Sequence, residues 1–124
     1  MGVFILKSAN ELRDRLKNRR EEHLKALWQE ANRMAHEAAR LGARRVILFG
    51  SLATKTAGLF SDLDLLIEME THLGFIERTV DVYSKLKPRV GVDLLIYTTE
   101  EISRMRDNPL IRRIFMEGQV LYEA

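Results

Sequence analysis

Three aspartates stand where hydrophobic strands are expected to begin. Asp62 and Asp64 lead one apolar run, and Asp93 lies inside a second, over residues 90–97. Acidic side chains are poor strand formers and are costly to bury without a partner. Their placement therefore favours a site that binds cations. The alternative, solvent-facing acids on half-exposed strands, is strongest for Asp62, because Ser61 and Asp62 could simply form a turn.

The spacing of these acids predicts that they share one face of a sheet. Alternate residues of a strand point to the same side, so Asp62 and Asp64 face away from the leucines that follow each of them. The string Asp-Leu-Leu-Ile occurs at both 64–67 and 93–96. If the two strands are neighbours in register, three carboxylates converge and raise one another's pKa values. Such a cluster favours Mg²⁺, and two ions could clamp the attacking and leaving oxygens of a phosphoryl-type displacement.

A Gly-Ser pair, Gly50-Ser51, precedes Asp62 by ten intervening residues. Glycine lets a phosphate approach the backbone, and the serine hydroxyl adds a hydrogen-bond donor. If a helix begins here, its N-terminus attracts an anion. A bare Gly-Ser is more often only a helix cap. The acids downstream make phosphate binding the better interpretation.

The rest of the pattern predicts an α/β fold, in which a small mixed sheet is packed with helices. Ser8 and Glu11 form a capping-box pattern that opens a long helix with an apolar stripe of helical period. We expect one domain over residues 1–124, with an N-terminal helix over 8–42 and a catalytic core over 43–124. Within that core we expect strands over 44–49, 62–69, 90–97 and 119–122 and helices over 51–56, 71–87, 98–106 and 109–116.

Composition narrows the class of protein. Hydrophobic residues make up 46% of the chain and charged residues 31%, which is typical of a soluble globular protein. The net charge of +2 is too small by itself to indicate nucleic-acid binding. The basic residues from Arg13 to Arg20 could contact RNA or an acidic partner, but the acids among them favour a solvated helix surface. The absence of cysteine excludes disulfides and thiolate metal sites, and no apolar run reaches membrane-spanning length. We expect a cytoplasmic protein.

At this point the chain resembles a known family, the nucleotidyltransferase superfamily of DNA polymerase β. The likeness is closest to the minimal nucleotidyltransferases, which are often encoded beside a small helical HEPN protein. It extends over residues 43–123 and includes a final strand like the one common in that family. The motif that carries it consists of Gly50-Ser51, ten intervening residues, Asp62-x-Asp64 and a third acid on a later strand, Asp93.

The resemblance implies a polymerase-β-like fold and a role for each motif residue. Gly50 and Ser51 would hold the β- and γ-phosphates of a nucleoside triphosphate, and Asp62 and Asp64 would bind two Mg²⁺ ions. Asp93 would bind the catalytic ion and help deprotonate an acceptor hydroxyl. That hydroxyl would attack the α-phosphorus in line, and pyrophosphate would leave. ATP is the expected substrate and AMP the transferred group, with another nucleoside monophosphate as the alternative.

One stretch departs from the pattern of the minimal relatives. Many of them continue Gly-Ser-x-Ala-Arg-Gly, whereas this chain has Thr54 and Lys55 at the last two positions. Lys55 could serve as the nucleotide-binding cation instead, although an ammonium group is a point charge with a different reach from a guanidinium.

The resemblance also implies a partner. The acceptor would be a tyrosine of a HEPN-type toxin, which makes the chain a protein adenylyltransferase, a type VII-like antitoxin, and one half of a hetero-oligomer. A second hypothesis is a catalytically weak binding module that neutralises the same toxin by covering it. A third, the nucleotidylation of a small molecule such as an aminoglycoside, ranks below both because no second domain is recognisable.

Overall fold

Four strands form one mixed sheet in the computed structural model, which describes residues 7–124. Their order across the sheet is β3-β2-β1-β4, with β1 antiparallel to both of its neighbours and β2 parallel to β3. This arrangement confirms the predicted α/β fold with a small mixed sheet. The strands are β1 Arg45–Phe49, β2 Leu63–Glu68, β3 Val92–Tyr97 and β4 Gln119–Glu123.

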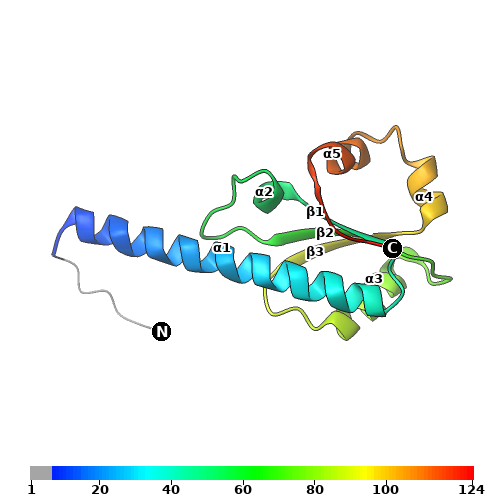
Figure 1. Cartoon of the computed structure of the whole chain (residues 1–124), viewed down its shortest axis with the longest axis horizontal. Helices are drawn as coiled ribbons and strands as arrows, with labels where there is room; N and C mark the ends of the chain where they lie inside the picture. The colour runs from blue at the N-terminus through cyan, green and yellow to red at the C-terminus, as the bar shows by residue number, and fades with distance from the viewer. Residues whose placement is uncertain (1–6) are drawn as a thin grey trace.

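Helices cover both faces of the sheet (Figure 1). Two of them, α1 and α3, pack on one face over the larger core, where Leu65, Ile67 and Ile96 are fully buried. The other face carries a smaller core, in which Ile111 and Ile114 of α5 pack on strand residues. The helices are α1 Ala9–Arg40, α2 Gly50–Ala53, α3 Phe75–Leu86, α4 Thr99–Arg104 and α5 Pro109–Glu117.

The long N-terminal helix is present as predicted. The Ser8 side chain caps it by accepting a hydrogen bond from the Glu11 backbone N–H at 3.1 Å. The buried residues of α1 lie between Leu27 and Ala38, while its first half extends beyond the sheet (Figure 1). None of the helices in residues 7–124 combines the length and the apolar character that a membrane span needs.

Helix α3 buries only some of the apolar residues that recur with helical period in its sequence, among them Leu86. Ile76 and Val80, which set that period, are 72% and 63% exposed, whereas Arg78 is only 7% exposed. The buried side therefore contains a guanidinium beside Val82 and Leu86. It is tolerated because each of its three nitrogens donates at least one hydrogen bond to the surrounding chain.

Arg78 of α3 forms hydrogen bonds that connect this helix with the loop before it, with β3 and with α4. Its guanidinium donates to the Leu73 carbonyl at 2.9 and 3.0 Å, to the Ile96 carbonyl at 3.2 Å and to Glu101 Oε1 at 2.6 Å. Glu101 also closes the capping box of α4 with Thr98. The hydrogen bond from Arg78 is the main reason that the pKa of Glu101 lies below its ordinary value.

We expect Arg78→Met to lower the free energy of unfolding by about 2 kcal/mol. Removing one partner of a buried ion pair usually costs more, but Glu101 is partly exposed and can regain water. Urea denaturation measures the loss. Arg104→Met removes an exposed pair on α4 and should change stability by less than about 0.5 kcal/mol. Equal losses in the two variants would contradict a special role for Arg78.

Candidate active site

Asp64 and Asp93 are brought together by the parallel pairing of β2 and β3. The two aspartates are direct partners in the register of these strands. Their neighbours Leu63, Leu65 and Leu94 are buried in the core under α1 and α3, so both carboxylates project from the opposite face. Asp64 is half-buried and Asp93 is exposed. The repeated string Asp-Leu-Leu-Ile thus aligns with itself across the two strands.

The carboxyl group of Asp64 is held in an unfavourable state. Its pKa is raised to about 6, first by burial, then by the charge of Asp93 and a hydrogen bond with it, and last by the charge of Asp62. The neighbouring acidic groups therefore oppose the negative charge of Asp64, and a bound cation would relieve this repulsion.

Asp62 lies one residue before β2, so it is not part of the strand. Its side chain is exposed and rests against Gly91, where an added Cβ would collide with the Asp62 carboxylate. The backbone N–H of Leu63 donates to the Gly91 carbonyl at 2.9 Å. The turn before β3 therefore holds Asp62 beside Asp64 and Asp93, the aligned pair of β2 and β3.

Gly50 stands directly against Asp64. Phe49 pairs with Asp64 in the antiparallel register of β1 and β2, and Gly50 follows it. Gly50 has a left-handed φ of +72°, and the space that a Cβ would fill is taken by the Asp64 carboxylate. Glycine is required here for both reasons. The Gly-Ser pair and the acids ten residues downstream thus lie side by side.

A cavity of about 420 Å³ opens over this point. Ser51 and Asp64 contribute polar groups to it, whereas the exposed Lys55 does not line it. The Thr54 hydroxyl donates a hydrogen bond at 3.2 Å to the Gly50 carbonyl, which lies only four residues earlier in the chain. The residues that line the cavity are Phe49, Gly50, Ser51, Thr54, Thr56, Asp64, Leu110, Arg113, Ile114 and Glu117.

Four of these residues come from α5, and sequence reasoning assigned none of them to the site. Leu110, Arg113, Ile114 and Glu117 follow the spacing of one helical face, which is visible in the sequence. The sequence does not predict whether this face of α5 points toward the Gly-Ser pair. That direction is set by burial of Ile111 and Ile114 against the sheet.

The donor set fits a magnesium ion that is shared with substrate. Mg²⁺ is usually held by one or two carboxylates together with substrate phosphates, and the aligned pair Asp64 and Asp93 offers two carboxylates. Among residues 7–124, no group of three His, Cys, Asp or Glu side chains is arranged to hold a metal ion. The roles of Asp62, Asp64 and Asp93 as metal ligands, and of Gly50, Ser51 and Lys55 in nucleotide binding, stay predictions.

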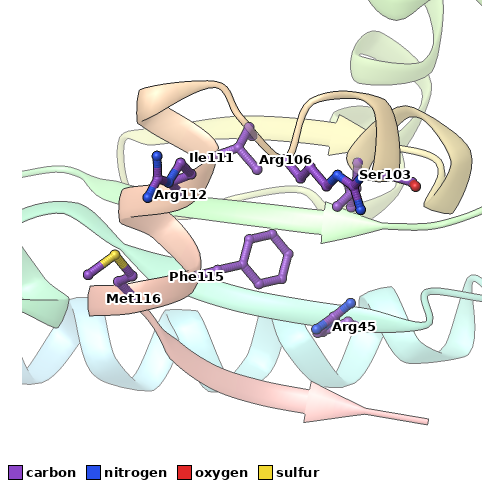
Figure 2. Close-up of a pocket in the computed structure, with 8 residues that line it drawn as sticks. Arg45, Ser103, Arg106, Ile111, Arg112, Phe115 and Met116 are labelled. Atoms are coloured by element: carbon purple, nitrogen blue, oxygen red, sulfur yellow. The ribbon is translucent and has the colours of Figure 1, made fainter.

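A second cavity, of about 470 Å³, lies on the other flank of α5. Figure 2 shows Phe115 projecting into it, with Ser103 and Arg106 on one side and Arg45 on the other. The Arg45 guanidinium lies 4.9 Å from the centre of the Phe115 ring and is paired with Glu68. None of the motif aspartates lines this cavity, so the candidate chemistry belongs to the first one.

Comparison with known proteins identifies the family. The family described as "Nucleotidyltransferase domain" matches residues 24–122, which span the sheet, the Gly-Ser pair and all three aspartates. The chain belongs to the nucleotidyltransferase family. As a nucleotidyltransferase of the polymerase-β type it has the expected fold, and this family generally uses a nucleoside triphosphate with Mg²⁺.

A solved structure supports the fold of this nucleotidyltransferase. A crystal structure from Sulfolobus solfataricus, described as a candidate nucleotidyltransferase, superimposes with a TM-score of 0.61 at 19% sequence identity. The match covers 82% of this chain and 85% of the other. At this identity the likeness establishes the fold and nothing more. No curated protein matches this nucleotidyltransferase.

Proposed function

We propose that this nucleotidyltransferase transfers AMP from ATP to a hydroxyl group. The observation that carries the proposal is the alignment of Asp64 with Asp93 beside Gly50 and the cavity that Ser51 and Asp64 line. Carboxylates, a backbone without Cβ and a hydroxyl donor are the groups that hold magnesium and phosphates. The family supports the same class of reaction.

Each residue has a defined task in this reaction. Gly50 and Ser51 would hold the β- and γ-phosphates, and Asp62, Asp64 and Asp93 would hold two Mg²⁺ ions. When bound, the ions neutralise the phosphates and the attacking oxygen. The acceptor oxygen forms a bond to the α-phosphorus, and the bond from that phosphorus to the bridging oxygen breaks. Pyrophosphate leaves, and Asp93 receives the hydroxyl proton. Positioning and charge neutralisation supply most of the rate.

For the acceptor we propose a tyrosine of a HEPN-type helical toxin, with this chain as its type VII-like antitoxin in a hetero-oligomer. Two observations support a protein acceptor. The described walls of the cavity come from one sheet with α2 and α5, which leaves much of it open to another chain. The exposed apolar residues Ile76, Val80 and Tyr83 on α3 also suit contact with a protein.

A second candidate function is neutralisation of the toxin without catalysis. The use of the Thr54 hydroxyl within α2, and the position of Lys55 outside the cavity, favour weak triphosphate binding. The long exposed first half of α1 suits a docking role (Figure 1). Nucleotidylation of a small molecule of the aminoglycoside type ranks below both.

Labelled ATP separates these functions. We expect that the chain, Mg²⁺ and the HEPN-type protein encoded beside it give label on that protein, and that replacing its acceptor tyrosine by phenylalanine removes the label. The double variant Asp62→Asn, Asp64→Asn should transfer none. If the double variant still neutralises the toxin and the unsubstituted chain transfers no label, the transferase proposal is wrong and the binding module stands.

A further inference from the structure

The charges around the first cavity are unbalanced for a triphosphate. Asp64 and Glu117 line the cavity, and Asp62 and Asp93 lie beside Asp64. All four side chains are acidic. Within residues 7–124, the cation that lines this cavity is Arg113 of α5. A nucleoside triphosphate brings several more negative charges, and metal ions at the aspartates would neutralise only the part that they touch.

Arg113 is free to bind a ligand, unlike several arginines of the fold. Arg33, Arg45 and Arg78 are each paired with a buried or half-buried glutamate. Among the described residues, no ion pair or hydrogen bond engages Arg113, although Glu117 lies one helical turn away. Its guanidinium therefore does not have to break an interaction with any described residue when a phosphate binds.

The helix that carries Arg113 is firmly placed. The Asn108 side chain caps α5 by accepting from the Leu110 and Ile111 backbone N–H groups, and Pro109 occupies the first turn. Ile111 and Ile114 are 2% and 1% exposed and pack against the sheet. This anchoring fixes which side of α5 faces Gly50 and Ser51, and it places the backbone of Arg113 at the edge of the cavity.

We infer that Arg113 binds the β- and γ-phosphates of the nucleotide, opposite the aspartates, and stays bound to pyrophosphate as it leaves. The inference rests on the proposed nucleotidyl transfer. A guanidinium presents a planar fork that matches two phosphate oxygens, which a lysine ammonium does not. Negative charge grows on the leaving pyrophosphate, so Arg113 stabilises the transition state more than the bound substrate.

Binding of three adenine nucleotides tests the role of Arg113. The measurement is isothermal titration with α,β-methylene-ATP, whose α–β bond cannot be cleaved, with ADP and with AMP, all in Mg²⁺. We expect Arg113→Ala to weaken binding of the triphosphate analogue about tenfold or more and that of AMP less than about twofold. Arg113→Lys should recover part of the loss. The melting temperature should not change, because Arg113 is exposed and unpaired among the described residues.

Arg112 is the matched control. It is the next residue of α5, carries the same charge, and lines the cavity of Figure 2 rather than the one beside Asp64. Arg112→Ala should leave all three affinities within about twofold. If Arg113→Ala binds the analogue as the unsubstituted chain does, or if Arg112→Ala loses as much, the inference is wrong and the proposed function survives. If the unsubstituted chain binds no triphosphate, both fail.

Discussion

Asp64→Asn is expected to remove nucleotidyl transfer and, at the same time, to stabilise the fold. The loss of transfer should be about 1,000-fold or more, because the amide lacks the negative charge that would hold the metal ions, and those ions would neutralise the phosphates. The gain in stability follows from the site itself. Asp64 is ionised at neutral pH in a place where burial and Asp93 both oppose its charge. Asparagine has nearly the same shape and carries no charge.

The way stability changes with pH shows whether the charge of Asp64 stabilises or destabilises the fold. The pKa of Asp64 is about 6 in the folded chain against an ordinary 3.8, so the folded state binds the proton more tightly. This group therefore destabilises the fold fully above pH 6, and the penalty disappears as the pH falls toward 4. The full shift corresponds to about 3 kcal/mol, and solvent screening of this half-exposed group reduces the expected effect to about 1 kcal/mol.

Urea denaturation of the metal-free protein at pH 4 and pH 7.5 measures this difference. We expect Asp64→Asn to exceed the unsubstituted chain in stability at pH 7.5 and to match it at pH 4. Other acids act in the opposite direction, because the pKa values of Glu30, Glu68 and Glu101 are lowered. The difference between the two proteins isolates Asp64. The exposed Asp107→Asn is the control, and lower stability of Asp64→Asn at pH 7.5 would contradict the prediction.

The aligned aspartates could be predicted because strand periodicity acts locally. Each run of alternating residues already separates a buried face from a face that carries an acid, and a register error of one residue would bury the acids. Equal spacing in the strings at 64–67 and 93–96 then favours the in-register pairing that the structure has. Helix existence and capping at Ser8 and Thr98 were also predictable from adjacent residues.

Contacts between distant segments could not be predicted in this way. The apolar period of α3 indicates a helix, but the side that is buried depends on Arg78 reaching Glu101, which lies 23 residues away. Likewise, Arg113 lies beside the site because α5, a helix late in the chain, packs over β1. The residues near Gly50 in the sequence do not predict this contact. Local patterns predict elements and faces, whereas partners across the fold depend on the packing of the whole chain.

Gly50→Ala is expected to damage both stability and transfer through one contact. A left-handed φ costs an alanine about 1–2 kcal/mol. The new Cβ would also collide with the Asp64 carboxylate, which would have to turn away from its place beside Asp93. A displacement of about 1 Å at a catalytic group lowers the rate of transfer about 100-fold. Denaturation and labelled-nucleotide transfer measure the two effects.

Two other glycines separate the causes. Gly42 also has a left-handed φ, +103°, but a Cβ there meets nothing within 4 Å, so Gly42→Ala should lose stability and keep transfer. Gly58 has neither constraint, and Gly58→Ala should change neither property.

A double-mutant cycle with Asp64→Ala completes the test. If the collision matters, Gly50→Ala should cost less stability when the carboxylate is absent, and the remainder should match the cost of Gly42→Ala. An unchanged cost in the Asp64→Ala background would mean that backbone strain alone explains the glycine. A reduced cost would mean that Gly50 is required because Asp64 occupies the space of its missing side chain. The Gly-Ser pair and Asp64 of β2 would then act as one structural unit.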